Sequence, residues 1–487
     1  MAFTIEQYPV DSTDKIPVIT NWTPLIGYMI YQSDIAGLFY YKLVLLVQQV
    51  NSAGVVIQDL GQFKQRRNGY SSDVSGDRAR AFFDLREIIN SQLVNTVFDQ
   101  NDTGAPFLTI HKLGANADAT FVLSTNGDNS TANYQILSIK ITGSEFYSAT
   151  ASAVPTSQGS TVTDTLIYTN ASLPLLTARN TDGDFVQSDA FNIFQASNIK
   201  DKFLTDTESY TVSVGLSSIT GYINYVREND YHTLAFLNDN DFDSDIDRLY
   251  IKYYDNTGTL QGGTGYISNT TVNGGMPPNN ASVEDEHRIL YFGCGPGNLE
   301  AQDATSARRP STAYADWVYY TIQGTASNGT TAKTALYYFV RQDGSCKGFK
   351  VRRLAWRNSL GCYDYFNFKM KSSQKIKVKR NNYNTLIGTY NKSNWRYNDT
   401  QRGLTTRDTS ATLTETLQTD WVSEQDARLL EKLIYSTNVE IVENTETEFT
   451  QGVVITDSSF TIKTTANDKM IKYTINIEYS NPVNTNS

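Results

Sequence analysis

Residues 423–436 read SEQDARLLEKLIYS, and residues 471–479 read IKYTINIEY. In the first stretch, apolar residues recur every three or four positions, which is the period of an amphipathic helix. Ser423 and Asp426 have the spacing of a capping box, which begins a helix. In the second stretch, apolar residues alternate with polar ones, as they do in a strand with one buried face. We therefore predict a C-terminal helix packed on an antiparallel sheet, in which residues 460–464 pair with residues 471–479.

Short alternating segments elsewhere also predict strands. Residues 41–47 and 55–57 flank a turn and predict a hairpin, and Asp84 with Glu87 predicts a short helix to about residue 94. Asp343-Gly344 predicts a hairpin turn between a strand at 336–340 and one at 349–356. Further strands are expected at residues 79–83, 121–123, 134–141, 165–168, 210–214, 234–237, 249–253 and 317–322, and loops at 148–160 and 261–302.

The composition agrees with this pattern. The 487 residues include 31 Tyr and 22 Phe, and only 19% of them are charged, which disfavours a disordered chain. Tyr, Phe, Thr, Val and Ile suit strands, while Asn and Gly suit turns. No repeat of fixed period is present, which disfavours solenoids and propellers. We expect a mainly β fold of several small β-sandwich or β-sheet domains with a few short helices.

We expect four domains from the changes of pattern along the chain. Residues 1–100 form a hairpin and helix domain, and residues 101–197 form a β-rich domain with long loops. Residues 198–305 form a β-rich domain with a long Gly/Asn-rich loop. Residues 306–487 form a C-terminal β domain with the capped helix.

No motif for catalysis or cofactor binding is found. The sequence lacks HExxH, a phosphate-binding loop, a dinucleotide fingerprint and GxSxG. Its histidines are expected to be surface or capping residues, and its cysteines, which show no CxxC spacing, to be small buried or half-buried side chains. These residues are His111, His232, His287, Cys294, Cys346 and Cys362. We expect a non-enzymatic chain with no metal and no cofactor. A tailspike-type hydrolase stays a minority alternative, because the carboxylate separation in such enzymes is spatial.

No targeting or membrane segment is recognised. The first dozen residues contain no basic region followed by an apolar one, so no signal peptide is expected. The strongest apolar run, residues 38–50, is shorter than the ~20 residues of a membrane helix. We expect synthesis in the cytoplasm and no membrane partner.

An acidic run stands out in the middle of the chain. Aspartates occupy alternate positions, namely Asp239, Asp241, Asp243, Asp245 and Asp247. Clustered carboxylates suit Ca²⁺, but Ser244 and Tyr250 stand where a calcium loop of the EF-hand type needs Gly and Glu. We interpret the run as an acidic loop in which Asp241, Asp243 and Asp245 are candidates for a subunit contact. A bound cation is the alternative.

A basic run follows in the last third of the chain. Residues 347–380 contain eleven basic side chains and one acid, a net charge of +10, so the other 453 residues carry −20. Such segregation favours a basic face that meets an acidic face of a neighbouring copy, as in ring assembly. DNA is the alternative partner, although no nucleic-acid-binding module is recognised. The candidate interface residues are Lys369, Lys371, Lys375, Lys377, Lys379 and Arg380.

Residues 353–368, RLAWRNSLGCYDYFNF, predict a strand, a tight Asn-to-Gly turn and a second strand rich in aromatic residues. This stretch resembles a W-N-x-x-G-x-x-D-x-F-x-F segment of structural proteins of tailed bacteriophages, particularly phages of Bacteroidota of the crAss-like type. The order of Thr419-Asp420-Trp421, the capped helix, residues 439–441 and the last strand pair is also similar to theirs. So is the opening hairpin followed by Phe83-Asp84-Leu85 and a short helix. Arg357, which follows Trp356, departs from the motif.

The resemblance implies a multi-copy, non-enzymatic component of the tail, collar or neck. We therefore expect a structural virion protein that forms a homo-oligomeric ring or tail-attached assembly with other tail or neck proteins. A tail component that binds a host receptor or glycan is the alternative, because exposed Tyr and Trp stack on sugars.

Overall fold

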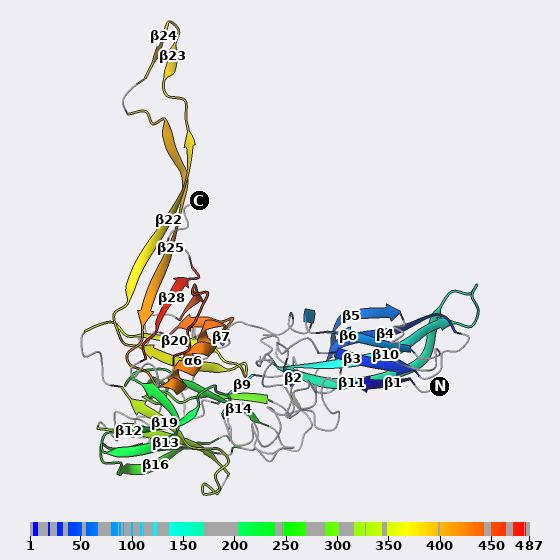
Figure 1. Ribbon diagram of the computed structural model, residues 1–487, viewed down its shortest axis with the longest axis horizontal. Coiled ribbons are helices and arrows are strands. Elements are labelled where there is room, and N and C mark those ends of the chain that lie inside the picture. Colours follow the sequence, from blue (N-terminus) through cyan, green and yellow to red (C-terminus); the bar gives the residue numbers. More distant parts are fainter. Residues whose placement is uncertain are drawn as a thin grey trace. The chain divides into compact units, whose positions relative to one another are not determined.

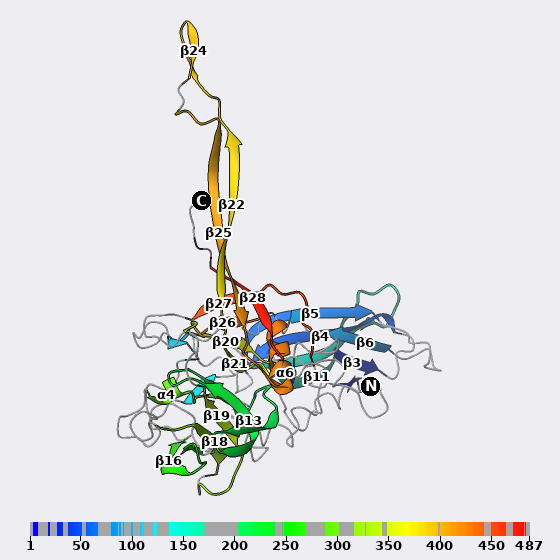
Figure 2. The ribbon, with the colours of Figure 1, turned by 60° about the vertical axis from the view of Figure 1, so that its left-hand side comes forward.

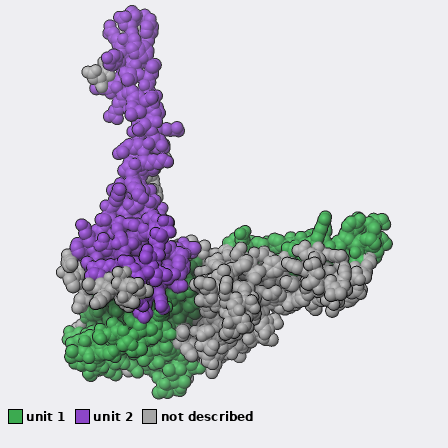
Figure 3. Space-filling view, in the orientation of Figure 1, with its two compact units in different colours: residues 1–342, 357–364 green, residues 343–356, 365–487 purple. Residues whose placement is uncertain are grey.

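The computed structural model is mainly β, as the sequence predicted, and it divides into two compact units (Figure 3). Unit 1 comprises residues 1–342 and 357–364, and unit 2 comprises residues 343–356 and 365–487. The structure describes residues 3–7, 18–19, 27–32, 38–50, 55–66, 79–85, 87–88, 91, 99–100, 108–109, 111, 120–123, 136–169, 203–238, 246, 248–268, 288–300, 316–326, 328–342, 348–397, 400–442, 450–463, 471–481 and 483.

A five-stranded sheet dominates the N-terminal part of unit 1 (Figure 1). Its order is β2 (Val18–Ile19), β11 (Thr156–Thr169), β10 (Ile136–Ser148), β4 (Phe39–Val50) and β5 (Val56–Arg66). The predicted hairpin of β4 and β5 is confirmed, and Leu43, Val44 and Leu45 of β4 are fully buried. The predicted loop at 148–160 is confirmed for residues 149–155 and is wrong from Thr156 onward, where the chain pairs with β10.

Two smaller sheets belong to the same part of the chain. One contains β1 (Phe3–Gln7), β3 (Gly27–Gln32) and β6 (Ala79–Asp84), and the other contains β7 (Asp99–Gln100) and β8 (Leu108–Thr109). Glu87, Ile88 and Ser91 are helical, within the range predicted for the short helix.

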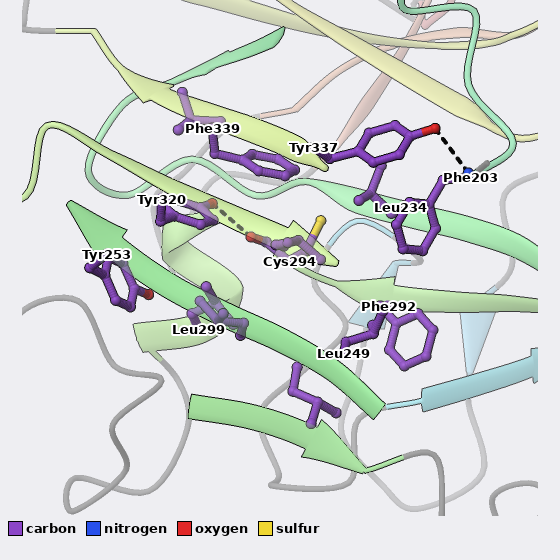
Figure 4. Packing of buried hydrophobic residues seen from close by; sticks show 14 of the residues in the cluster. Phe203, Leu234, Leu249, Tyr253, Phe292, Cys294, Leu299, Tyr320, Tyr337 and Phe339 are labelled. Atoms are coloured by element: carbon purple, nitrogen blue, oxygen red, sulfur yellow. Dashed lines mark hydrogen bonds between the residues drawn. The ribbon is translucent and has the colours of Figure 1, made fainter. Parts of the chain in front are cut away.

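A six-stranded sheet forms the second part of unit 1. Its order is β12 (Ser209–Val214), β13 (Ser217–Val226), β19 (Tyr337–Arg341), β18 (Tyr319–Thr325), β15 (Arg248–Tyr254) and β16 (Leu260–Ser268). A three-stranded sheet of β14 (Thr233–Asn238), β17 (Arg288–Gly293) and β9 (Thr120–Leu123) and the helix α4 (Pro296–Glu300) complete it. The core is aromatic (Figure 4): the Tyr320 hydroxyl donates to the Cys294 carbonyl at 2.7 Å, and the Phe203 N–H donates to the Tyr337 hydroxyl at 3.0 Å.

Three expectations for this region need correction. The predicted loop at 261–302 contains most of β16, all of β17 and helix α4. The predicted domain boundary at residue 305 falls inside unit 1, because β18 pairs with β15 in one sheet. The predicted hairpin between 336–340 and 349–356 does not form: β19 pairs with β18 and, in parallel, with β13, whereas β20 (Arg352–Arg357) pairs with β26 (Val439–Ile441).

Unit 2 is built on a seven-stranded sheet. Its order is β21 (Tyr363–Phe368), β20, β26, β27 (Gln451–Ile455), β28 (Thr474–Tyr479), β25 (Leu404–Gln418) and β22 (Ser373–Asn384). The final strand therefore pairs with β25 and β27, and the predicted pairing with residues 460–464 is wrong, because residues 460–463 are not a strand. Phe460 instead stacks on Tyr473 at 4.5 Å between ring centroids.

Helix α6 (Glu424–Ile434) confirms the predicted capped helix. The Ser423 hydroxyl accepts from the Asp426 N–H at 3.0 Å, and the Asp426 carboxylate accepts from the Ser423 N–H at 3.2 Å. Leu430 and Leu433 are fully buried in the core of unit 2, with Trp356 and Ile475 in the same cluster. The apolar face of the helix therefore docks on the sheet, as the 3.6-residue period requires.

The predicted turn between β20 and β21 is also confirmed, and it belongs to unit 1. The Asn358 side-chain oxygen accepts the N–H groups of Leu360 and Cys362, at 3.0 and 2.9 Å, and the Gly361 N–H donates to the Asn358 carbonyl at 3.1 Å. Gly361 has φ +82°, a conformation that favours glycine, so the Asn-to-Gly spacing fixes the turn.

Candidate assembly interface

Strands β22 and β25 leave the seven-stranded sheet of unit 2 as a long two-stranded ribbon (Figures 1 and 2). From Leu413 outward to Leu404, β22 is the strand that pairs with β25 among the described residues, from Leu413–Ile376 to Leu404–Asn384, and the Val483 N–H donates to the Ala411 carbonyl at 3.0 Å. All twelve residues of β22 are exposed. We call residues 373–418 the arm. At ~3.3 Å per residue, β22 alone spans about 40 Å.

The two faces of the arm differ in chemistry. Lys375, Lys377 and Lys379 occupy alternate positions and lie opposite Thr414, Thr412 and Ser410 on what we call the lysine face. Ile376 and Val378 lie opposite Leu413 and Ala411 on the apolar face. Ile376 and Val378 are 56% and 43% exposed, so this face is open to solvent on β22, whereas Ala411 of β25 is buried.

The outer end of the arm, residues 385–403, which we call the tip, carries β23 (Thr389–Asn391) and β24 (Asn394–Arg396). Tyr390 lies opposite Trp395, and an added Cβ on Gly388 would lie 2.5 Å from the Trp395 indole nitrogen. Only glycine therefore lets the backbone approach the indole ring so closely. The large exposed apolar side chains at or beside the tip are Leu386, Ile387, Tyr390, Trp395, Tyr397 and Leu404.

The root of the arm is fixed by a buried carboxylate. Glu415 accepts from Arg352 Nε at 2.9 Å, from the Tyr479 hydroxyl at 2.6 Å and from Gln374 Nε2 at 3.1 Å. Burial by itself would raise the pKa of Glu415, but the hydrogen bonds from Arg352, Tyr479 and Gln374 hold that pKa below its ordinary value of 4.5. The carboxylate thus ties β25 to three other strands at the point where the arm begins.

The predicted interface residues fall into three groups. Lys375, Lys377, Lys379 and Arg380 are exposed on the arm, and Lys371 is exposed just before it. Lys369 is half-buried and directly follows β21. Asp241, Asp243 and Asp245, together with Asp239 and Asp247, lie outside the described residues, so the structure does not test their predicted role.

The basic run is not one surface. Arg352 and Arg353 are buried in unit 2, where Arg352 pairs with Glu415 and Arg353 donates to Asn367 Oδ1 at 3.0 Å. Only the later part of the run reaches the arm.

The sequence did show the signal for the arm, which is Lys alternating with Ile and Val in residues 375–379 and Thr-rich alternation in 404–416. Neither segment has enough apolar residues for both of its faces to be buried in a core.

A separate polar cluster is buried in unit 1. Asp364 accepts from the Thr205 hydroxyl at 2.5 Å and from the Asp206 N–H at 2.9 Å, and Asp206 accepts from the Ser359 N–H at 2.8 Å and from its hydroxyl. Asn358 Nδ2 donates to the Leu204 carbonyl at 2.9 Å. Burial and the nearby Asp206 carboxylate raise the pKa of Asp364 to about 7.

This shift predicts a pH dependence for unit 1. Because the pKa of Asp364 is about 7 in the folded state and about 3.8 in the unfolded chain, the folded state binds more protons between these values. The stability of unit 1 should therefore fall as the pH rises from about 4 to about 7. Asp364→Asn should remove that part of the fall, which thermal midpoints of both proteins across this range would measure. An identical pH dependence in the variant would contradict the prediction.

The histidines and cysteines form no site in the described part of the chain. His111 and His232 are buried, so the expectation of surface histidines is wrong for these two, and His287 lies outside the described residues. Cys294 and Cys362 are buried, as predicted, and do not form a disulfide with each other, and Cys346 lies outside the described residues. Among the described residues, no three His, Cys, Asp or Glu side chains gather closely enough to hold a metal ion.

Comparisons with known proteins add no identification. No family model matches the chain, and no curated protein matches it. Within the described residues, no helix has the length and apolar character needed to cross a membrane.

Proposed function

We propose that this chain is a structural, non-enzymatic subunit of a multi-copy assembly, and that the arm makes the contact between copies. The observation that carries the proposal is the exposure of all twelve residues of β22. An isolated two-stranded ribbon is marginally stable at best in water, so a projecting one with apolar side chains on it calls for a covering partner.

The apolar side chains of the arm supply a driving force for association. Complete burial of one large apolar side chain contributes about 1.5 to 3 kcal/mol, and association itself costs roughly 4 to 15 kcal/mol. The apolar face and the tip together present enough such groups, among them Ile376, Val378, Leu386, Tyr390, Trp395 and Tyr397, to exceed that cost when several are covered.

Charge favours a second copy as the partner. Residues 373–418 contain eight basic and three acidic side chains, a net charge of +5, so the rest of the chain carries −15. Opposite charges across an interface speed encounter and select the partner. An arm from one copy is therefore matched in charge to the remainder of another copy.

The resemblance to structural proteins of tailed phages makes the proposal more specific. We propose a virion component of the tail, collar or neck that assembles as a ring or as a tail-attached oligomer. A receptor- or glycan-binding tail component is the second candidate, because Tyr390, Trp395 and Tyr397 are exposed together at the tip and aromatic rings of this kind stack on sugars.

Charge reversal on the lysine face tests the proposal. The variant Lys375→Glu/Lys377→Glu/Lys379→Glu should be monomeric at concentrations at which the wild type is multimeric, because it turns attraction to an acidic surface into repulsion. Light scattering after size-exclusion chromatography measures the mass of both. The matched control, with Arg at the same three positions, should still assemble.

Three outcomes would overturn the proposal. A monomeric wild type would remove the assembly role, and an assembling Glu variant would show that the lysine face is not in the contact. Tight, salt-dependent retention of DNA by the wild type, with a Glu variant that still assembles, would instead assign the chain to the lining of a genome's path.

A further inference from the structure

We infer that the contact between copies is heterologous. The arm of one copy lies on the body of the next, which is the acidic remainder of the chain outside residues 373–418, and two arms do not pair with each other. The inference rests on the proposed function, and it names the partner surface of the arm. It excludes the other simple arrangement, in which the outer edges of two β22 strands join around a two-fold axis.

The alternation of lysines argues against that two-fold arrangement. β22 is an edge strand of the seven-stranded sheet, so its outer edge could accept another strand. A two-fold axis perpendicular to the ribbon returns each residue to the same face. Directly opposite residues of an antiparallel pair also share a face. Hence odd-numbered residues of one β22 can lie opposite only odd-numbered residues of the other.

This parity brings the lysines together. Lys375, Lys377 and Lys379 are all odd-numbered, so every register that overlaps them puts lysine opposite lysine or beside it. With Lys377 at the centre, Lys377 lies opposite its own copy, and Lys375 lies opposite Lys379 of the other chain. Like charges directly opposite each other are destabilising, and lysine on an edge strand is a common protection against edge pairing.

One lysine of the lysine face forms an ion pair with a carboxylate of the same chain. Lys377 Nζ lies 3.5 Å from Glu478 Oε2 on β28, at the root of the arm. Among the described residues, Lys375 and Lys379 have no such ion pair. An acidic surface of a neighbour can therefore pair with these two lysines, while the apolar face and the tip pack on the same neighbour.

A heterologous contact has a direction. Each copy offers one arm and one acceptor surface, so copies join head to tail and form a ring if the rotation closes. An isologous arm pair, by contrast, stops at a dimer. The difference can be measured with a chain that lacks the arm but keeps the body.

The experiment uses a variant in which Asn-Gly replaces residues 376–413. Lys375 and Thr414 are directly paired, so a two-residue turn can join them. This arm-less chain should be monomeric alone. Mixed in equal amount with wild type, it should enter the wild-type multimers and shorten them to about two copies, because each arm-less chain ends a head-to-tail series. Affinity capture of a tagged arm-less chain and light scattering give the two readouts.

The outcomes separate the inference from the proposed function. A monomeric wild type would overturn both. A multimeric wild type that excludes the arm-less chain and keeps its size would overturn the inference alone, since arms would then pair with arms. An arm-less chain that assembles alone would also overturn it. If the arm-less chain fails to fold, the mass of the wild-type multimer decides instead, because arm-to-arm pairs stop at a dimer and a head-to-tail contact forms larger multimers or rings.

Discussion

Glu415→Gln should lower the free energy of unfolding of unit 2 by about 3 to 5 kcal/mol, the usual cost of leaving one partner of a buried ion pair without its opposite charge. Glu415 is fully buried, and its carboxylate holds Arg352, Tyr479 and Gln374. The amide of Gln keeps the shape of the side chain but not its charge. Hydrogen exchange of the strands of unit 2 would measure the loss, because it reports on this unit separately.

An exposed ion pair of the same sheet supplies the control. Lys377→Gln breaks the pair with Glu478, in which the side chains are 55% and 35% exposed, and should cost about 0 to 1 kcal/mol. Equal losses in the two variants would contradict the prediction. The pH dependence gives a second check: because the folded-state pKa of Glu415 lies below 4.5, its stabilisation is present above that pH and is lost below it. The Gln variant should lack this loss.

Leu430→Ala should destabilise unit 2 by about 2 to 5 kcal/mol, since removal of a buried leucine side chain loses its burial and leaves a cavity. Leu430 and Leu433 are both fully buried on the inner face of α6, and Leu433→Ala should have an effect of the same size. Hydrogen exchange of the sheet strands under α6, or denaturation in urea, would measure the change.

Leu404→Ala is the matched control for this prediction. Leu404 is 64% exposed at the outer end of the arm, so its truncation should change stability by less than about 0.5 kcal/mol. If Leu430→Ala has no larger effect than Leu404→Ala, α6 does not contribute to the core as described.

The features that the sequence predicted well are those fixed by neighbours in the chain. Helix α6 follows from a capping box and a 3.6-residue period, and the turn at Asn358–Gly361 follows from side-chain hydrogen bonds over four residues. The hairpin of β4 and β5 is also local. Each of these elements is stabilised by contacts that a short stretch of sequence already contains.

The errors involve pairing between distant segments. β19 pairs in parallel with β13, more than a hundred residues earlier, and no local pattern distinguishes that partner from the adjacent β20. The prediction of a single basic face is wrong for Arg352, because this residue is paired with Glu415 from another strand. The arm is not predictable for a similar reason: the alternation in residues 375–379 and 404–416 indicates strands, but it does not show that, among the described strands, β25 pairs only with β22 from Leu413 to Leu404.

The way the two units share the chain affects folding during synthesis. The turn at residues 357–364 belongs to unit 1, although the chain on both sides of it belongs to unit 2. Strand β20 leaves the ribosome before the last piece of unit 1, and its partner β26 follows about eighty residues later. During translation, the apolar side chains of Leu354 and Trp356 therefore stay exposed until β26 has been synthesised. Domains generally fold as units while the chain grows, and exposed apolar segments are then prone to aggregate. A nascent chain stalled between residues 364 and 439 should be a preferred target for chaperones, and a fragment that starts at residue 365 should fold poorly.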